Sequence, residues 1–182
     1  MTKVRIHCLE AIFTAVILAA CLLFSFSFAQ NRSADPVPRR AQEEDIHEAV
    51  FLYLFEIGTG PDPDYSFYCL SVDSDGPQAL HDPSDALLKC FPRMHRTIRK
   101  ASECEVLKKA KNFANAVKDK QSGQPAWMIS VGSIDWVNDH EVRVGGTRYC
   151  GGLCMWSTVL KVTLKDAKWR VAIAPDAPLF VS

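Results

Sequence analysis

The stretch that decides the fold runs from Ala126 to Ala174 and reads AWMISVGSIDWVNDHEVRVGGTRYCGGLCMWSTVLKVTLKDAKWRVAIA. It holds four segments rich in β-branched and aromatic residues, at 126–137, 141–149, 156–164 and 169–174. Apolar and polar residues alternate in these segments, which is typical of strands with one buried face. The stretch therefore predicts a meander of antiparallel strands, with Gly132 at a bulge in the first strand.

Helical spacing appears before these strands. Ile46, Val50, Leu54 and Ile57 recur at intervals of three and four residues, which predicts a helix over about 42–57. The sequence Asp-Pro-Ser-Asp at 82–85 is a helix start, with Asp82 as the expected N-cap and the helix ending before Pro92.

Residues 65–118 also contain a strand-like segment, a basic segment and an ambiguous segment. Residues 65–72 (YSFYCLSV) are rich in strand formers, and 93–100 is a basic segment expected to be a solvated loop. Residues 103–118 are ambiguous, because Val106, Ala110, Phe113 and Val117 keep helical spacing while Phe113, Asn115 and Val117 also alternate as in a strand. One helix followed by a run of strands predicts an α+β fold, in which an N-terminal helix packs in the concavity of a curved antiparallel sheet.

The N-terminus has the features of an export signal. Lys3 and Arg5 precede an uncharged run over 11–28, and Ser27 and Ala29 suit a cut before residue 30. The expected organisation is a signal peptide at 1–29, a Pro-bearing linker at 30–42 and one α+β domain at 43–182. The protein is then exported to a periplasmic, extracellular or envelope-associated location. Any membrane contact is made through the N-terminal segment alone.

Two alternatives to cleavage after Ala29 stay open. The sequence Leu-Ala-Ala-Cys at 18–21 is spelled like a lipobox, which would make Cys21 a lipid acceptor. An uncleaved leader would instead anchor the chain in a membrane.

Five cysteines lie beyond the leader, so at least one of them is unpaired in an oxidising compartment. The Cys150-Gly-Gly-Leu-Cys154 loop can fold back on its glycines, which predicts a disulfide between Cys150 and Cys154. The connectivity of Cys69, Cys90 and Cys104 is undecided.

Composition and motifs exclude several functions. Lys+Arg 21 balance Asp+Glu 21, so the basic field that nucleic-acid binding requires is missing. No phosphate loop, dinucleotide fingerprint or nucleophile elbow occurs, and no metal site or cofactor is expected. His47-Glu48 lacks the second histidine that a catalytic zinc helix needs, because residue 51 is Phe. Asp135 and His140, at one strand turn, are the nearest approach to an acid/base pair.

Several segments together resemble a family of uncharacterised exported bacterial proteins. The resembling segments are EAVFLYLF, DPSD, VGSIDWVNDHEVRVGG, RYCGGLC and VLKVTLKDAKWRVA, which cover most of the chain after the leader. The family is similar to the cystatin-like or nuclear-transport-factor-like α+β roll, and this similarity implies strands between Phe113 and Val117. It implies no activity and no catalytic residue.

The sequence therefore favours a non-catalytic extracytoplasmic binding or interaction domain whose partner is unknown. One alternative is an enzyme with a small-molecule pocket between the first helix and the sheet, using Asp135 or His140. Another is a membrane-tethered structural protein of the envelope. The ligand, any reaction and the oligomeric state are not encoded in a recognisable pattern.

Overall fold

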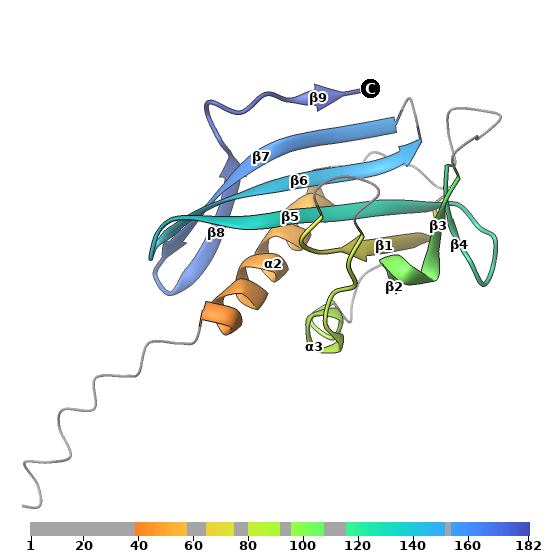
Figure 1. Cartoon of the computed structure of the whole chain (residues 1–182), viewed down its shortest axis with the longest axis horizontal. Coiled ribbons are helices and arrows are strands. Elements are labelled where there is room, and N and C mark those ends of the chain that lie inside the picture. The colour runs from red at the N-terminus through yellow and green to blue at the C-terminus, as the bar shows by residue number, and fades with distance from the viewer. Residues whose placement is uncertain (1–38, 58–64, 75–79, 92–95, 108–115, 152–153) are drawn as a thin grey trace, which may run out of the picture. The chain divides into compact units, whose positions relative to one another are not determined.

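The computed structural model describes residues 39–57, 65–74, 80–91, 96–107, 116–151 and 154–182. These belong to a compact unit that runs from Arg39 to Ser182 (Figure 1). The predicted signal segment 1–29, with Cys21, and linker residues 30–38 lie outside the described residues. Residues 39–42 are helical, so the linker prediction is wrong at its C-terminal end. None of the described helices is long and apolar enough to cross a membrane.

The elements follow one another along the chain in this order: α2 (Arg39–Glu56), β1 (Phe67–Ser71), α3 (Asp85–Leu88), β2 (Thr97–Lys100), the 3₁₀ turn η1 (Ala101–Glu103), β3 (Cys104–Val106), β4 (Val117–Asp119), β5 (Ala126–Asn138), β6 (Glu141–Gly151), β7 (Cys154–Lys165), β8 (Lys168–Ile173) and β9 (Phe180–Val181). The helix, the four long C-terminal strands and the strand at β1 were all predicted within a few residues.

The main sheet is curled and mixed, with strand order β2-β1-β5-β6-β7-β8. Neighbours from β5 to β8 are antiparallel, and β9 pairs with β7 beyond the end of β8. However, β1 runs parallel to both β5 and β2, so the expectation of a wholly antiparallel sheet is wrong. The α+β class is confirmed in its coarse form, a curled mixed sheet with one main helix.

Three local predictions differ from the structure. The basic segment at 93–100 is not all loop, because Thr97–Lys100 forms the edge strand β2, where charged side chains are tolerated. The ends of the ambiguous segment form the antiparallel pair β3 and β4, and residues 108–115 lie outside the described residues. Helix α3 is one turn long and is capped by Ser84, whose Oγ accepts from the backbone of Leu87 at 3.0 Å. Asp82, the expected cap, instead accepts from the backbone and hydroxyl of Ser102.

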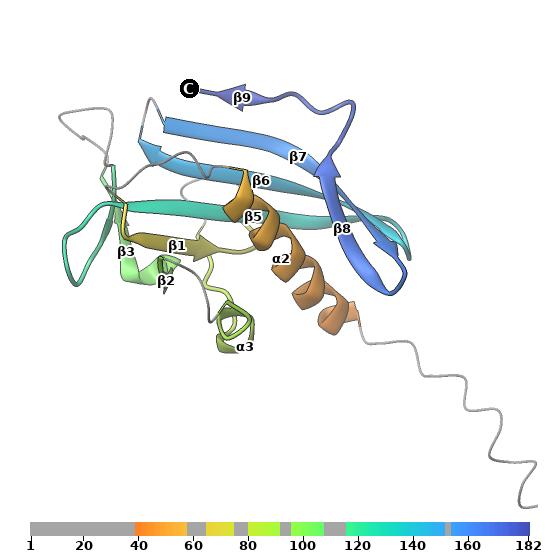
Figure 2. The same cartoon turned by 180° about the vertical axis from the view of Figure 1, so that it is seen from behind.

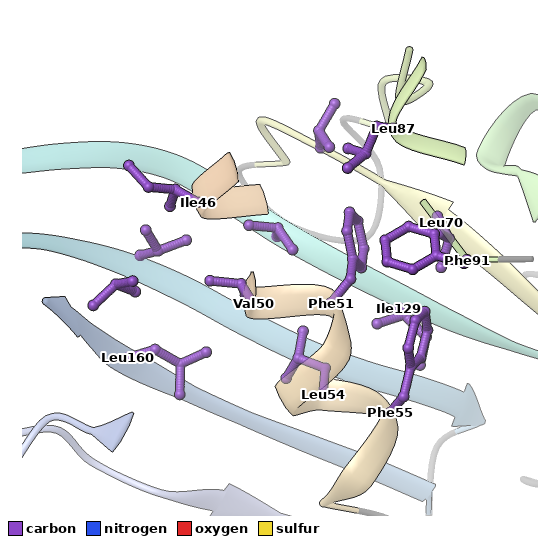
Figure 3. Packing of buried hydrophobic residues seen from close by; sticks show 14 of the residues in the cluster. Ile46, Val50, Phe51, Leu54, Phe55, Leu70, Leu87, Phe91, Ile129 and Leu160 are labelled. Carbon is purple, nitrogen blue, oxygen red and sulfur yellow. The ribbon is translucent and has the colours of Figure 1, made fainter. Parts of the chain in front are cut away.

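Helix α2 covers one face of the sheet. In Figure 2 it lies in front of the strands, and in Figure 1 the strands lie in front of it. Its buried stripe, which includes Val50, Phe51 and Leu54, packs against Ile129 and Leu160 of the sheet (Figure 3). The four tryptophans also pack, partly buried, around this core.

A smaller core lies on the face of the sheet that α2 does not cover. It includes Phe67, Met128 and Val117, together with a disulfide between Cys69 of β1 and Cys104 of β3. This bond ties the small β3–β4 sheet to the main sheet. The family resemblance implied strands between Phe113 and Val117. Of this range the structure describes Ala116 and Val117, and Val117 is the first residue of β4.

A buried carboxylate fixes the neighbouring hairpin. Asp119 accepts from the hydroxyl and backbone N–H of Ser122 at 2.6 and 2.7 Å, and its other oxygen accepts from Nε of Arg99 at 3.2 Å. The hydrogen bond from the Ser122 hydroxyl, helped by its backbone N–H and by Arg99, lowers the pKa of Asp119 against the opposing effect of burial. Asp119 is therefore ionised and stabilises the link between β4 and the edge strand β2.

Candidate functional site

The face of the sheet opposite α2 carries a groove. Side chains alternate between the two faces of a strand, so odd-numbered residues of β6 point away from the helix while Val142 and Val144 point toward it. A cavity of about 170 Å³ lies on the odd-numbered side. We call it the helix-free groove, and its lining residues are Ser74, Met128, Ser130, Gly132, Gly145, Thr147, Tyr149 and Met155.

The floor of the groove is bare backbone at two glycines. A Cβ on Gly132 would lie 3.4 Å from Cα and N of Gly145, so β5 and β6 meet closely here. The pairing register shifts between Val131 and Ile134, which confirms the predicted bulge at Gly132. Gly145 has open space above it, since the nearest atom to a Cβ there is Cα of Gly132 at 3.9 Å. The two glycines therefore leave this part of the groove lining without side chains.

Gly146, the next residue, belongs to the opposite face. A Cβ at this position would lie 2.8 Å from Cδ1 of Leu160 and 3.2 Å from Cδ2 of Leu54. The pair Gly145-Gly146 therefore has two separate roles, one in the groove and one under the helix.

The walls of the groove combine apolar surface with hydroxyl groups. Met128, Tyr149 and Met155 supply the apolar part, and thioether side chains adapt readily to differently shaped ligands. Oγ1 of Thr147 and Oγ of Ser157 lie 2.9 Å apart and share a hydrogen bond. The backbone N–H of Ser74 donates to the carbonyl of Val131 at 3.1 Å, which holds the chain after β1 against the groove.

One end of the groove adjoins a disulfide hairpin. Cys150 and Cys154 follow Tyr149 and precede Met155, and they form a disulfide with a Cα–Cα distance of 5.3 Å. The predicted pairing is therefore confirmed. Such a short loop gains little from closure entropy, so the bond mainly fixes how β6 and β7 turn beside the groove. Cys90 is exposed and unpaired.

Charged groups on this face gather beyond the other end of the groove. Arg143 and Asp176 form a two-point ion pair, with N–O distances of 2.9 and 2.7 Å, and Lys161 contacts Glu141 at 2.7 Å. Hydrogen bonding to Arg143 lowers the pKa of Asp176, and the same contact raises the pKa of Arg143. These charges neutralise one another, while the residues lining the groove carry none.

The predicted acid/base candidates lie elsewhere. Asp135 is exposed on β5, opposite Arg143 in the strand register. His140 is exposed in the β5–β6 turn, and its backbone N–H donates to Oδ1 of Asn138 at 2.8 Å. Neither residue lines the helix-free groove, the cavity between α2 and the β7–β8 turn, or the cavity between α2 and the end of β1. The structure therefore does not bring the pair into the pocket that the enzyme hypothesis placed there.

Sequence reasoning missed the groove itself. Its chemistry lies in uncharged residues spread over three strands, which form a set only once β5, β6 and β7 are paired in register. The signal that the sequence did contain is the glycine at each of the two floor positions, Gly132 and Gly145. Among the described residues, no group of three His, Cys, Asp or Glu side chains is arranged to hold a metal ion.

No family model matches the chain, and neither a curated protein nor a solved structure matches it.

Proposed function

We propose that this chain is an exported, non-catalytic binding domain, built as a cystatin-like or nuclear-transport-factor-like roll. It takes a small, uncharged, mainly apolar ligand in the helix-free groove. The observation that carries the proposal is the lining of that groove, in which apolar side chains surround a few hydroxyl groups on a glycine floor. This is the composition typical of small-molecule sites, where apolar walls supply affinity and a few polar groups fix orientation.

The same lining argues for binding rather than turnover. Acid/base and nucleophilic catalysis need a base within hydrogen-bonding reach of the reacting group. The described residues around the groove offer hydroxyls and thioethers, but no carboxylate, imidazole, amine or thiol. Thr147 bonds to another hydroxyl, that of Ser157, instead of to a base.

Export is supported by two independent features. The leader at 1–29 has a basic start, an apolar run and small residues before the expected cut. The two disulfides, Cys69–Cys104 and Cys150–Cys154, are compatible with an oxidising compartment. The intact mass of the natural product tests the leader directly. A mature chain that begins at Gln30 supports the proposal, and one that begins at Met1 in the cytosol rejects it.

Ligand binding can be tested with an uncharged fluorescent probe, N-phenyl-1-naphthylamine, titrated into the full chain. The variant Gly145→Val places a branched side chain on the groove floor, where the backbone has room for a Cβ. We expect it to weaken probe binding roughly tenfold or more, because the added carbons occupy space that the groove otherwise leaves open at Gly145. The melting temperature should remain near that of the unaltered protein, since strands favour β-branched residues.

A matched control lies on the same strand pair. Val137→Leu alters an apolar side chain that is 52% exposed near the end of β5, outside the groove lining. It should leave the probe affinity unchanged within about twofold. Equal affinity in Gly145→Val and in the unaltered protein would reject the groove as the site. Equal weakening by both variants would show that the probe binds the exposed surface instead.

A further inference from the structure

A second cavity lies on the other side of the sheet, where the start of α2 meets the end of β1 and the approach to α3. Its volume is about 260 Å³. We call it the His47 cavity, and its lining residues are Arg40, Glu43, Glu44, His47, Val72, Asp73, Asp82, Pro83, Ser84 and Leu87. It is polar where the helix-free groove is apolar, and the two cavities share no lining residue.

One side chain in this cavity is buried without a complete set of hydrogen bonds. His47 is only 8% exposed, and its Nε2 has no hydrogen-bond partner among the described residues. A buried polar atom without a partner costs folding free energy, so such atoms are rare unless a ligand or solvent satisfies them. Nε2 of His47 is therefore an unsatisfied hydrogen-bonding atom of a residue that lines the cavity, and a bound group that reaches it would gain a hydrogen bond.

The imidazole of His47 is held in its neutral form. Burial lowers its pKa, against the opposing effects of Asp73, Glu43 and Glu44. A neutral imidazole carries its proton on one nitrogen and a lone pair on the other, so Nε2 accepts a hydrogen bond in the tautomer whose proton is on Nδ1. The site thus offers an uncharged acceptor next to negatively charged acceptors.

The charges around His47 select the sign of the ligand. Glu43 and Glu44 come from α2, Asp73 follows β1, and Asp82 precedes α3, whereas Arg40 is the one cation in the lining. The Asp82 carboxylate already accepts from Ser102, but it keeps its negative charge. Four carboxylates against one guanidinium leave an excess of negative charge, which favours a cationic ligand.

We propose that the His47 cavity binds the primary ammonium group of a small organic amine. An ammonium group has three donors, which match the lone pair of His47 Nε2 and the carboxylates of Glu43 or Glu44 and Asp73. The cavity volume leaves room for an alkyl chain behind that group. This inference is independent of the helix-free groove and goes beyond the proposed function.

The test uses 1,4-diaminobutane and the full chain. Isothermal titration calorimetry should detect saturable binding, and a ¹H–¹⁵N spectrum of the histidine rings should show a shift at Nε2 of His47. The exposed ring of His140 should not shift, because it lies in the β5–β6 turn away from the cavity. We expect His47→Phe to weaken binding roughly tenfold, since phenylalanine has no acceptor and one hydrogen bond to a charged group is lost.

Two further variants separate a built site from general attraction between charges. Glu43→Gln and Asp45→Asn each remove one negative charge from the same part of α2, but only Glu43 lines the cavity. Glu43→Gln should weaken binding roughly tenfold, and Asp45→Asn should change it less than about twofold. Gln also keeps a high helix propensity, so α2 should remain folded.

Four results would overturn the proposal. These are no binding of 1,4-diaminobutane at millimolar concentration, binding without a change at His47, and equal weakening by Glu43→Gln and Asp45→Asn. The fourth is tighter saturable binding of Ca²⁺ or Zn²⁺ at the same residues, which would identify a metal site instead.

Discussion

The adjacent residues Gly145 and Gly146 of β6 face opposite sides of the sheet, so substitutions at these two positions test which side each residue faces. Gly146→Ala puts a methyl group 2.8 Å from Cδ1 of Leu160 and 3.2 Å from Cδ2 of Leu54. Both leucines are fully buried, so neither can move aside into solvent. Gly145→Ala puts the same methyl group on the open side, where the nearest atom is Cα of Gly132 at 3.9 Å.

The difference between the two variants isolates the collision in the core. Each replaces Gly with Ala in the same strand, so the gain of about 0.4–1 kcal/mol from a stiffer unfolded chain is common to both. Overpacking a close-packed core costs about 1–3 kcal/mol. Gly146→Ala should therefore be less stable than Gly145→Ala by about 1–3 kcal/mol. For a domain of this size the difference is roughly 3–12 °C in melting temperature.

Urea denaturation of the oxidised chain measures this difference, provided that both variants unfold with the same slope. A third variant checks the cause. Leu160→Ala alone should cost about 2–5 kcal/mol by leaving a cavity. In that background Gly146→Ala should lose most of its own cost, because the nearest colliding atom is gone. Equal stability of the two alanine variants, or the reverse order, would refute the assigned faces, since a one-residue slip in register exchanges them.

Three further predictions concern the disulfide core and the buried titratable groups. Replacing Cys69 and Cys104 together by Ser should lower the free energy of unfolding by about 4 kcal/mol, as expected for a disulfide between residues 35 apart in the sequence. Urea denaturation measures this loss, and a loss under about 1 kcal/mol would contradict the prediction. The pKa of Asp119 is lowered in the folded protein, so its contribution to the free energy of unfolding is complete above about pH 4 and is lost as the pH falls further. Asp119→Asn should reduce the free energy of unfolding at pH 7 by about 1.5–3 kcal/mol and make it depend less on pH in the acid range. Because burial lowers the pKa of His47 in the folded protein, the unfolded chain binds a proton at this histidine first as the pH falls below about 6.5. The melting temperature should therefore drop between about pH 7 and 5. The drop should be smaller in the variant His47→Gln.

Strong periodicity made most of the fold predictable. The apolar stripe of α2 and the alternation in β5 to β8 follow from single sequence segments, so their positions were confirmed within a few residues. The parallel pairing of β1 was not predicted, because pairing direction depends on partners distant in sequence. A signal was nevertheless present: Phe67–Ser71 is apolar without alternation and is buried on both faces, as parallel strands commonly are.

Short and charged elements were harder to predict. Edge strand β2 has four residues, of which Arg99 and Lys100 are charged, and its stability comes from tertiary contacts. Arg99 pairs with Asp119 and lies over the ring of Phe67 at 5.2 Å, while Lys100 contacts Asp85 at 2.6 Å. None of these partners is close in sequence, so no local pattern identifies the strand.

The disulfide and the two cavities also differ in how far apart their residues lie in the sequence. The Cys150–Cys154 disulfide was predictable because both ends and the intervening glycines lie within five residues. The helix-free groove joins residues of three strands and the chain after β1, and all of its lining residues are uncharged. His47 was noticed only beside Glu48, whereas its cavity is completed by Asp73 and Asp82 from other elements.

The most direct test of the binding function is a methyl spectrum of the full chain labelled with ¹³C at the methionine methyl groups. Met128 and Met155 line the helix-free groove from neighbouring strands, so they report on its occupancy. Addition of N-phenyl-1-naphthylamine should shift the resonances of both methyl groups, and Gly145→Val should abolish the shift. Probe binding that leaves both resonances unchanged would contradict the assignment of the groove as the ligand site.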